Sequence, residues 1–493
     1  MRRLFALLLG ISLLAGLGQP ANAQAAQIDK AYTYNEDDKA VPSPNSYQFK
    51  TIINAQSLGI DSFSSAQDLF VDSQDQIYLL DSGKKRVIWI DENYELVHII
   101  DSFTWKDEPL TLADGAQGIF YREATQSLYI ADTNNNRIIV CDRTGAVSQV
   151  YTKPETALLD NGLPYAPTKL VVDELGLMYV LTLNVNTGAL MIDSENQFLG
   201  FYGVNAIKET LELKIEHMWR SIMNTTQNSQ SEVSFQPTEL ANLYWSDDFF
   251  IYAVSPVTDT VESPVVKLNP VGENVLDGTE FGDSPDEEYE DVPIFTDITA
   301  DAGGVFTVLD LTSGKIYQYD EECTLMTVFG GLGYQKGLYQ LPVAIESNSG
   351  GDILVLDAKK NTITVMEQTY YGEKIREALF LYNDGLYEEA LECWFEILRM
   401  NANYSLAYVG IAEAYLSMGE YRLAMDYFYQ GGDKDGYSEA KTAMWREVLR
   451  NSFAFVAAVV VVIMLLILCY DGIKKYSKLT VQTLKKKRKG VES

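Results

Sequence analysis

The sequence predicts a mainly β protein with a helical C-terminal part and a single membrane-spanning helix. Three observations predict this class. A β-strand phrase recurs six times between residues 66 and 367. The apolar residues change to helical spacing from Tyr371 onwards, and residues 453–470 form an apolar stretch without a charged residue.

The N-terminal residues have the parts of an export signal. Two arginines precede an apolar stretch at residues 4–17, and Ala21-Asn22-Ala23 forms an A-x-A cleavage site. We therefore expect a signal peptide at residues 1–23 and a linker at residues 24–46. An uncleaved anchor is the alternative, although the apolar stretch is short for a bilayer that needs about 20 helical residues.

The C-terminal apolar stretch predicts a transmembrane helix at residues 452–470, because a backbone in lipid must pair its polar groups internally. The tail that follows, residues 471–493, carries eight basic and two acidic residues. The positive-inside rule places such a tail in the cytoplasm, so we expect the preceding residues to be extracellular. The prediction is a single-pass type I protein of the cell membrane, whose basic tail contacts the anionic inner leaflet. A stop-transfer role explains the tail, and recruitment of a protein is the alternative.

The part expected outside the cell is strongly acidic. The chain has a formal charge of −31, and removing the tail (+6) and the signal peptide (+2) leaves −39 for residues 24–470. This charge repels nucleic acid, so we expect no nucleic-acid partner. Because the chain has only four cysteines, its stability is expected to come from an apolar core rather than from disulfides.

The recurring phrase is a short apolar strand, a turn, a second strand that usually ends in Asp, a polar loop and a third strand. Strong copies lie at residues 66–91, 118–142, 296–320 and 342–367, and weaker copies lie at 167–193 and 237–268. We call the Asp at the end of the second strand the closing Asp; in the strong copies it is Asp81, Asp132, Asp310 or Asp357. The closing Asp residues are 51 residues apart in the first two of these copies and 47 apart in the last two. This period is typical of one four-stranded blade. The sequence therefore predicts a six-bladed β-propeller over residues 47–370.

Closure of this ring is predicted from its two ends. Residues 47–54 have strand character but no blade of their own, and the last copy ends after its third strand. We therefore expect the N-terminal strand to complete the last blade, which removes exposed sheet edges.

The phrase Ala131-Asp132-Thr-Asn-Asn-Asn-Arg137-Ile resembles the NHL repeat. Together the six units resemble an NHL-type propeller, an architecture similar to that of gluconolactonase-like proteins. The third and fourth units depart from the family because they lack the Asp-x-x-x-x-Arg phrase. The resemblance implies that Asp132 and Arg137 fix their loop by hydrogen bonds.

Two insertions interrupt the repeats. Residues 205–227 have apolar residues at helical spacing, which predicts a helix that covers a propeller flank or acts as a lid over a ligand. Residues 277–291 hold eight carboxylates and predict a solvated loop. Their spacing is not that of an EF-hand calcium loop.

The C-terminal part predicts a short helical array at residues 371–451. Three of its residues recur 34 positions later: Gly385, Tyr387 and Ala390 become Gly419, Tyr421 and Ala424. This pattern resembles two tetratricopeptide repeats followed by a capping helix. The chain departs from that family in having Ala402 and Gly436 where proline is usual.

Catalytic motifs are scarce. The chain has two histidines, His98 and His217, which excludes a three-histidine zinc site. No G-x-S-x-G, P-loop or dinucleotide fingerprint is present. No cofactor is evident, although a lactonase-type site of one carboxylate and two Asn from different blades would hold a divalent cation. The sequence alone does not place such a set.

Binding is therefore the favoured function, on polar loops of the propeller and on the first helix of each helical repeat. The predicted binding residues are Lys84, Lys85, Asn134, Asn135, Lys359, Lys360, Tyr382, Asn383, Glu413 and Ser417. We expect a membrane-anchored extracellular binding or scaffold protein with a protein or ligand partner, in the setting of an envelope or transport complex. A helical array that only spaces the propeller from the membrane is equally consistent with the sequence.

Two other functions stay open. One is a gluconolactonase-like, metal-dependent hydrolase on the propeller. The other is an extracellular carbohydrate-binding module. Its candidate stacking residues are Trp89, Trp105, Trp219 and Trp245.

Overall fold

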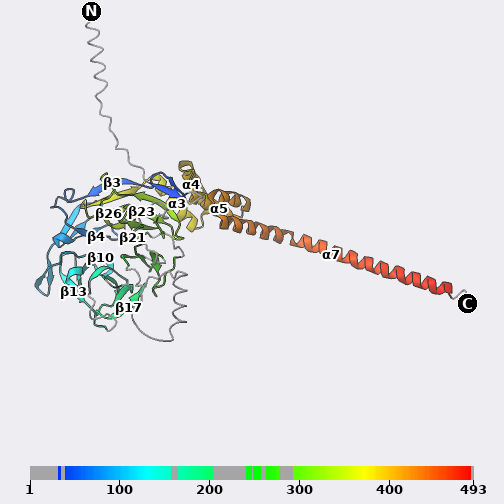
Figure 1. Ribbon diagram of the computed structural model, residues 1–493, viewed down its shortest axis with the longest axis horizontal. Coiled ribbons are helices and arrows are strands. Elements are labelled where there is room, and N and C mark those ends of the chain that lie inside the picture. Colours follow the sequence, from blue (N-terminus) through cyan, green and yellow to red (C-terminus); the bar gives the residue numbers. More distant parts are fainter. Residues whose placement is uncertain are drawn as a thin grey trace, which may run out of the picture. The chain divides into compact units, whose positions relative to one another are not determined.

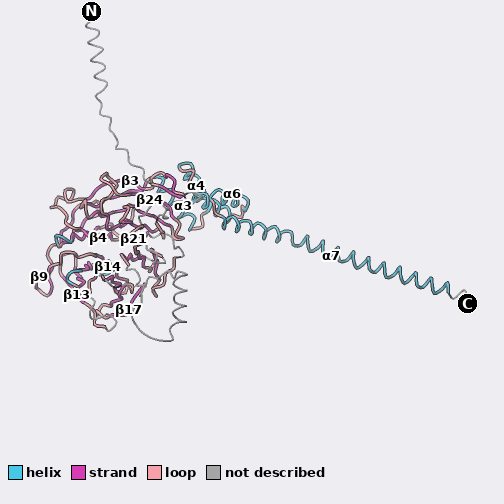
Figure 2. The backbone as a smooth tube through the Cα atoms, in the orientation of Figure 1, coloured by secondary structure: helices cyan, strands magenta, loops and turns pink. Residues whose placement is uncertain are grey.

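A computed structural model describes residues 31–34, 39–156, 165–183, 185, 187–203, 240–246, 248–256, 263–276, 281–282, 292–301 and 303–489. The predicted signal peptide, the predicted helix at 205–227 and nearly all of the acidic segment 277–291 lie outside these residues. The chain divides into two compact units near Arg376: strands dominate the first, and helices form the second (Figure 1, Figure 2).

The first unit is a six-bladed β-propeller, as predicted. Blade one comprises β4 (Ala66–Val71), β5 (Ile77–Asp81), β6 (Arg86–Ile90) and β7 (Leu96–Ile100). Blade two comprises β10 (Gly118–Arg122), β11 (Ser127–Asp132), β12 (Arg137–Cys141) and β13 (Val147–Thr152). Blade three comprises β14 (Pro167–Val172), β15 (Met178–Thr182), β16 (Ala189–Ile192) and β17 (Phe198–Tyr202). Blade four comprises β18 (Asn242–Trp245), β19 (Ile251–Val254) and β20 (Val265–Leu268). Blade five comprises β21 (Phe295–Ala300), β22 (Phe306–Asp310), β23 (Lys315–Tyr319) and β24 (Leu325–Gly330). Blade six includes β25 (Pro342–Ser347), β26 (Ile353–Asp357) and β27 (Thr362–Gln368).

The predicted closure is confirmed. Strand β3 (Tyr47–Ile53) pairs antiparallel with β27, in a register that runs from Ile53 opposite Ile363 to Tyr47 opposite Gln368. Blade six is therefore completed by the N-terminal strand. The inner strands β4, β10, β14, β18, β21 and β25 contact one another in sequence, and β25 returns to β4. The ring is closed.

The hydrophobic core lies between neighbouring blades. Strands β5, β15, β22 and β26 are buried at every position, because each sheet packs against a blade on both of its faces. One cluster joins blades six and one through residues such as Ile53, Leu79 and Leu354. Another joins blades one and two through Leu80, Ile119 and others. Stability therefore comes from apolar burial, and the four cysteines form no disulfide with one another.

The hairpin turns at the blade ends explain why Asp recurs outside the closing position. Asp72 accepts hydrogen bonds from the backbone N–H groups of Gln74 and Gln76 at 3.0 and 2.9 Å. Asp142 does the same for residues 144 and 146, and Asp320 for residues 322 and 324. These are Asx turns, in which the side chain satisfies the backbone donors of a tight reversal.

Two features differ from the expected plan. Part of the segment expected to be a linker, residues 24–46, forms strands β1 (Tyr32–Tyr34) and β2 (Ala40–Pro42). Tyr32 pairs with Val328 at the open edge of blade five, so the extra strands cover backbone groups that would otherwise be unpaired. A further hairpin, β8 (Phe103–Trp105) and β9 (Glu108–Leu110), lies in the connection between blades one and two.

The second unit is helical. Its elements are α3 (Tyr370–Asn383), which begins in the first unit, α4 (Tyr387–Met400), α5 (Ser405–Ser417), α6 (Tyr421–Gly431) and α7 (Lys434–Lys489). Gly385 and Gly419 end α3 and α5 with φ values of 77° and 81°, which explains their recurrence at the same place in each hairpin. Within the described residues, α7 is the one helix that is long and apolar enough to cross a membrane, and its most apolar stretch is not buried by the chain.

Candidate functional site

Six equivalent positions on the inner strands define the centre of the propeller. Five of them lie opposite the residue that comes just before the end of the second strand's repeat phrase, as in the pairing of Asp68 with Leu80 and of Asp297 with Leu309. The sixth, Lys169, comes just before Leu170, which pairs with Val180. The six residues are Asp68, Gly118, Lys169, Asn242, Asp297 and Ala344. Four of the six are polar.

Lys169 and Asp68 meet across the ring. The Lys169 Nζ lies 2.5 Å from Asp68 Oδ1, although the two residues belong to blades three and one. Blade two lies between them and has Gly118 at the equivalent position. A Cβ there would lie 2.3 Å from the Thr168 carbonyl oxygen, so a close approach of two inner strands requires the glycine. The other Asp68 oxygen accepts from the Ile119 N–H at 2.8 Å.

Asp297 is held by three N–H donors from three blades. Its Oδ1 accepts from the Asn242 side chain and from the Ile298 N–H, and its Oδ2 accepts from the Ile345 N–H at 2.7 Å. Asp68 and Asp297 thus play the same part, since each carboxylate joins its inner strand to the inner strand of the next blade.

Glu346 adds a third carboxyl group, two residues after the ring position of blade six. Its Oε2 is 3.5 Å from the hydroxyl of Thr299, which also lies 3.0 Å from the Ser347 hydroxyl. We call Asp68, Lys169, Asn242, Asp297 and Glu346 the axial cluster. Its members come from five of the six blades.

Burial dominates the electrostatics of the axial cluster. It raises the pKa of Asp297 to about 7, against the attraction of Lys169. Burial, followed by the charges of Asp297 and Asp68, raises the pKa of Glu346 well above its usual range. Burial also raises the pKa of Asp68, which the Lys169 ammonium opposes. Burial thus favours the protonated form of all three carboxyl groups.

The chemistry open to the axial cluster follows from these contacts. Its carboxylates accept from amide groups and from one ammonium group. Among the described residues, no three His, Cys, Asp or Glu side chains are arranged to hold a metal ion. One amide, Asn242, is present where a lactonase-type set has two, and it already donates to Asp297.

Sequence reasoning missed the axial cluster, but a signal was present. In the aligned copies, a polar residue stands third in the strands AQDLFV, PTKLVV and FTDITA, where an apolar residue would fit the core. Comparing that single column of the repeats would have identified Asp68, Lys169 and Asp297 together.

The closing Asp of each strong copy fixes a loop, as the NHL resemblance implied. Asp132 accepts from the Ala113 N–H at 2.8 Å and from the Arg137 Nε at 2.7 Å. Asp310 and Asp357 likewise accept from backbone N–H groups of the connection that precedes their blade. These contacts tie the second and third strands of a blade to its entering segment.

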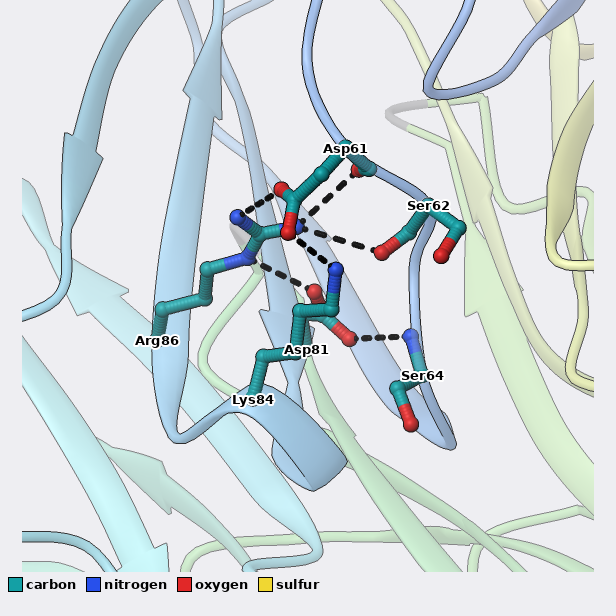
Figure 3. Close-up of polar contacts among 6 residues, drawn as sticks. All are labelled: Asp61, Ser62, Ser64, Asp81, Lys84 and Arg86. Carbon is teal, nitrogen blue, oxygen red and sulfur yellow. Dashed lines mark hydrogen bonds and ion pairs between the residues drawn. The ribbon is translucent and has the colours of Figure 1, made fainter.

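Blade one has the most extensive version of this contact (Figure 3). The buried Asp81 accepts from the Arg86 Nε at 2.7 Å and from the Ser64 N–H at 2.7 Å. The Arg86 guanidinium also contacts Asp61 Oδ1 at 2.6 Å, and Lys84 forms an ion pair with the same carboxylate. The hydrogen bond from Lys84, followed by that from Arg86, lowers the pKa of Asp61 to about 2.

The predicted loop residues lie on this same end of the propeller, but most of them contact their own chain. Lys84 and Lys85 form ion pairs with Asp61 and Asp114, the latter at 3.4 Å. Asn134 and Asn135 donate to the Asp114 and Thr111 carbonyl oxygens. Lys360 donates to the Leu338 and Gln335 carbonyl oxygens, whereas the Lys359 side chain is exposed.

The predicted residues of the helical array lie on α3 and α5. Tyr382 and Asn383 end α3, where the Tyr382 ring packs edge-on against Tyr387 at 5.4 Å between centroids. Glu413 and Ser417 lie on α5; Ser417 and Asn383 are exposed, and Glu413 is half-buried. Their role in binding stays a prediction.

The candidate stacking residues are engaged within the fold where the structure describes them. The Trp89 Nε1 donates to Gln76, and the Arg143 guanidinium lies 4.4 Å from the Trp89 ring centroid. Trp105 and Trp245 are partly buried against core clusters, and Trp219 lies outside the described residues. His98 is exposed on β7, the outer strand of blade one.

No protein-family model matches the sequence, and no curated protein matches it. Among solved structures, it is similar to virginiamycin B lyase from Staphylococcus aureus, with 11% identity over 65% of this chain and 100% of that chain, at a TM-score of 0.40. A gluconolactonase from Xanthomonas campestris has 13% identity, 67% and 98% coverage and a TM-score of 0.40. The WD40 β-propeller domain of Doa1 has 10% identity, 67% and 99% coverage and a TM-score of 0.39. The number of blades is established by the strand pairing itself.

Proposed function

We propose that this chain is a membrane-anchored extracellular recognition protein, whose propeller binds a protein partner outside the cell. The observation that carries the proposal is the course of α7. Ala440, near its start, is fully buried in the helical array, and an exposed 18-residue apolar stretch follows in the same helix. The basic residues beyond that stretch support an extracellular propeller through the positive-inside rule.

The contact point for the partner is the loop end of blade six. Tyr334, in the connection that enters this blade, is 87% exposed. Lys360 binds the carbonyl oxygens of the same connection, and Lys359 beside it is exposed to solvent. Tyrosine is among the residues that dominate protein interfaces.

The test is capture of partners by the full chain in its native membrane. The Tyr334→Ser/Lys359→Glu variant should lose a partner that the unmodified chain retains. Leu175→Ser is the matched control, because Leu175 is 94% exposed in a hairpin turn at the opposite end of the blades. Retention of every partner by the double variant, or equal loss in the control, would contradict the proposed surface. Cleavage of the propeller by protease added to intact cells tests its location.

The helical hairpins α3–α4 and α5–α6 support a tetratricopeptide-like role as a second recognition surface or as a spacer. Asn383→Ala/Ser417→Ala tests this second surface, because both side chains are exposed. A partner that the variant still captures assigns these helices to spacing.

A lactonase-type hydrolase is the second candidate. The grouping of Asp68, Asn242, Asp297 and Glu346 from four blades supports it, although among the described residues these carboxyl groups are not arranged to hold a metal ion. Such an enzyme would use a divalent cation. The test is lactone turnover and thermal stabilisation with Ca²⁺, Mn²⁺ or Zn²⁺, compared between the unmodified chain and Asp297→Asn. Turnover that requires the metal and Asp297 would replace the recognition proposal, and its absence favours recognition.

A further inference from the structure

Between the helical array and the membrane stretch, helix α7 has an apolar side and a polar side. A helix turns by about 100° per residue, so Trp445, Val448 and Leu449 lie within one arc of about 100°. We call these three residues the apolar arc. They are 54%, 46% and 67% exposed, so the described part of the chain does not cover them. The opposite side of the same turns carries the polar residues Arg446, Glu447, Arg450 and Asn451.

The apolar arc continues into the membrane stretch. Because α7 is one unbroken helix, the angular positions carry over from one segment to the next. By this register Val456, Ile463 and Tyr470 continue the same side of the helix, and all three are exposed. Ser452 is the single polar residue on this side between Trp445 and Tyr470. The arc and the stretch therefore form one apolar surface, so the lipid around the stretch also meets the arc.

The two sides of α7 consequently have different apolar lengths. On the polar side only residues 453–470 are apolar, which is about 27 Å of helix and close to the hydrocarbon thickness of about 30 Å. On the side of the apolar arc, the apolar length runs from Trp445 to Tyr470 and is about 39 Å. A helix whose apolar length exceeds the bilayer tilts, and this longer side fits a core of about 30 Å at a tilt of about 40°. The tilt has a defined direction, because only the side of the arc has the additional length.

The ends of the longer apolar side are aromatic. Trp445 and Tyr470 lie about 20° apart around the helix axis, and Trp and Tyr are the residues that are enriched at the two membrane–water interfaces. Without a tilt, Trp445 would lie about 12 Å beyond the hydrocarbon, outside an interfacial layer that is about 5–8 Å thick. A tilt towards the apolar arc brings Trp445 into this layer.

We propose that α7 crosses the bilayer at a tilt, with the apolar arc inserted into the outer leaflet and Trp445 among its phospholipid headgroups. Arg446, Glu447, Arg450 and Asn451 face water and headgroups on the other side of the helix. This rests on the proposed function in one respect, the passage of residues 453–470 through the membrane with the propeller outside. The membrane anchor thus begins eight residues before the membrane stretch and leans in one direction.

The test attaches one spin label at a time to the full chain, at positions 445, 448 and 449 of the apolar arc and at positions 447 and 451 of the polar side. Cys323 and Cys469 are first replaced by serine, while Cys141 and Cys393 are buried. The chain is reconstituted in phosphatidylcholine vesicles, and collisions with oxygen and with a water-soluble nickel complex are measured. The ratio of oxygen to nickel collisions should be severalfold higher on the apolar arc than at the neighbouring polar positions. A label at position 463 reports whether the membrane stretch lies in the bilayer.

Substitution of the arc supplies the control. Trp445→Ser/Leu449→Ser should lower the ratio at position 448 to that at position 447, whereas Tyr429→Ser, at a residue of α6 that is 79% exposed, should leave it unchanged. Equal ratios at 447 and 448, with a label at 463 that is protected from nickel, would overturn the proposed tilt and leave the membrane passage intact. Spin–spin broadening at 445 and 449 would also overturn it, because a second copy would then cover the apolar arc. A label at 463 that is open to nickel would contradict the proposed function as well.

Discussion

Replacement of Lys169 by methionine should destabilise the propeller in a pH-dependent way. Methionine fills similar space but leaves Asp68 buried without the ammonium group at 2.5 Å. Breaking a buried ion pair by removal of one partner costs about 3–5 kcal/mol. At about 2 °C per kcal/mol for a domain of this size, the midpoint of thermal unfolding should fall by about 6–10 °C at pH 8.

The direction of the pH dependence follows from the raised carboxyl pKa values. A carboxyl group with a folded-state pKa above its unfolded value of about 4 binds more protons in the folded state. Its stability contribution therefore decreases as the pH rises from the unfolded to the folded pKa. For Asp297, with a folded pKa of about 7, this amounts to about 4 kcal/mol between pH 4 and pH 7. Removal of Lys169 raises the pKa of Asp68 further, so Lys169→Met should cost less at pH 5 than at pH 8.

The assay is thermal unfolding of the detergent-solubilised chain at pH 5 and pH 8, followed by circular dichroism of the β-strands. Lys169→Arg should retain most of the stability. Asp68→Asn/Lys169→Met should recover part of the loss, because the neutral amide oxygen can still accept from the Ile119 N–H. Equal losses at both pH values, or a double variant no more stable than Lys169→Met, would refute the assignment of a buried ion pair.

Three further predictions concern single contacts. Gly410→Ala should destabilise the helical array by about 1–3 kcal/mol in urea unfolding, because the new Cβ would lie 2.5 Å from the Trp394 ring. An unchanged free energy of unfolding would mean that α4 and α5 separate easily. Asp132→Ala should destabilise blade two by about 1–3 kcal/mol, because the Ala113 N–H and Arg137 lose their acceptor, and unchanged stability would argue against a structural role. Burial raises the pKa of Cys141 to about 12, so this thiol should resist alkylation at pH 8 until the chain is unfolded, and rapid labelling of the native protein would contradict the packing of β12.

The features that the sequence predicts correctly are those that repeat. The closing Asp residues recur at the spacing of one blade, and the unmatched strand at residues 47–54 leaves the last blade as its one sensible partner. The axial cluster could not be predicted in the same way. Lys169 and Asp68 are 101 residues apart, and their contact depends on how the ring closes. Each is a single polar residue in an apolar strand, and the apolar periodicity of a strand does not indicate that such a residue has a partner.

The polar loops show a second limit of prediction from sequence, because their residues are those that the conformation of the turn favours. Lys85, Asn136 and Asn361 occupy the same position in three blades and have φ values of 56°, 55° and 54°. Asn is among the residues that tolerate this left-handed conformation best, so its recurrence reflects backbone geometry. Side chains beside these positions then bind nearby carbonyl and carboxylate oxygens, as Asn134 and Lys84 do. A polar propeller loop is therefore weak evidence for a binding surface, and an exposed aromatic residue such as Tyr334, which the turn does not require, is stronger evidence.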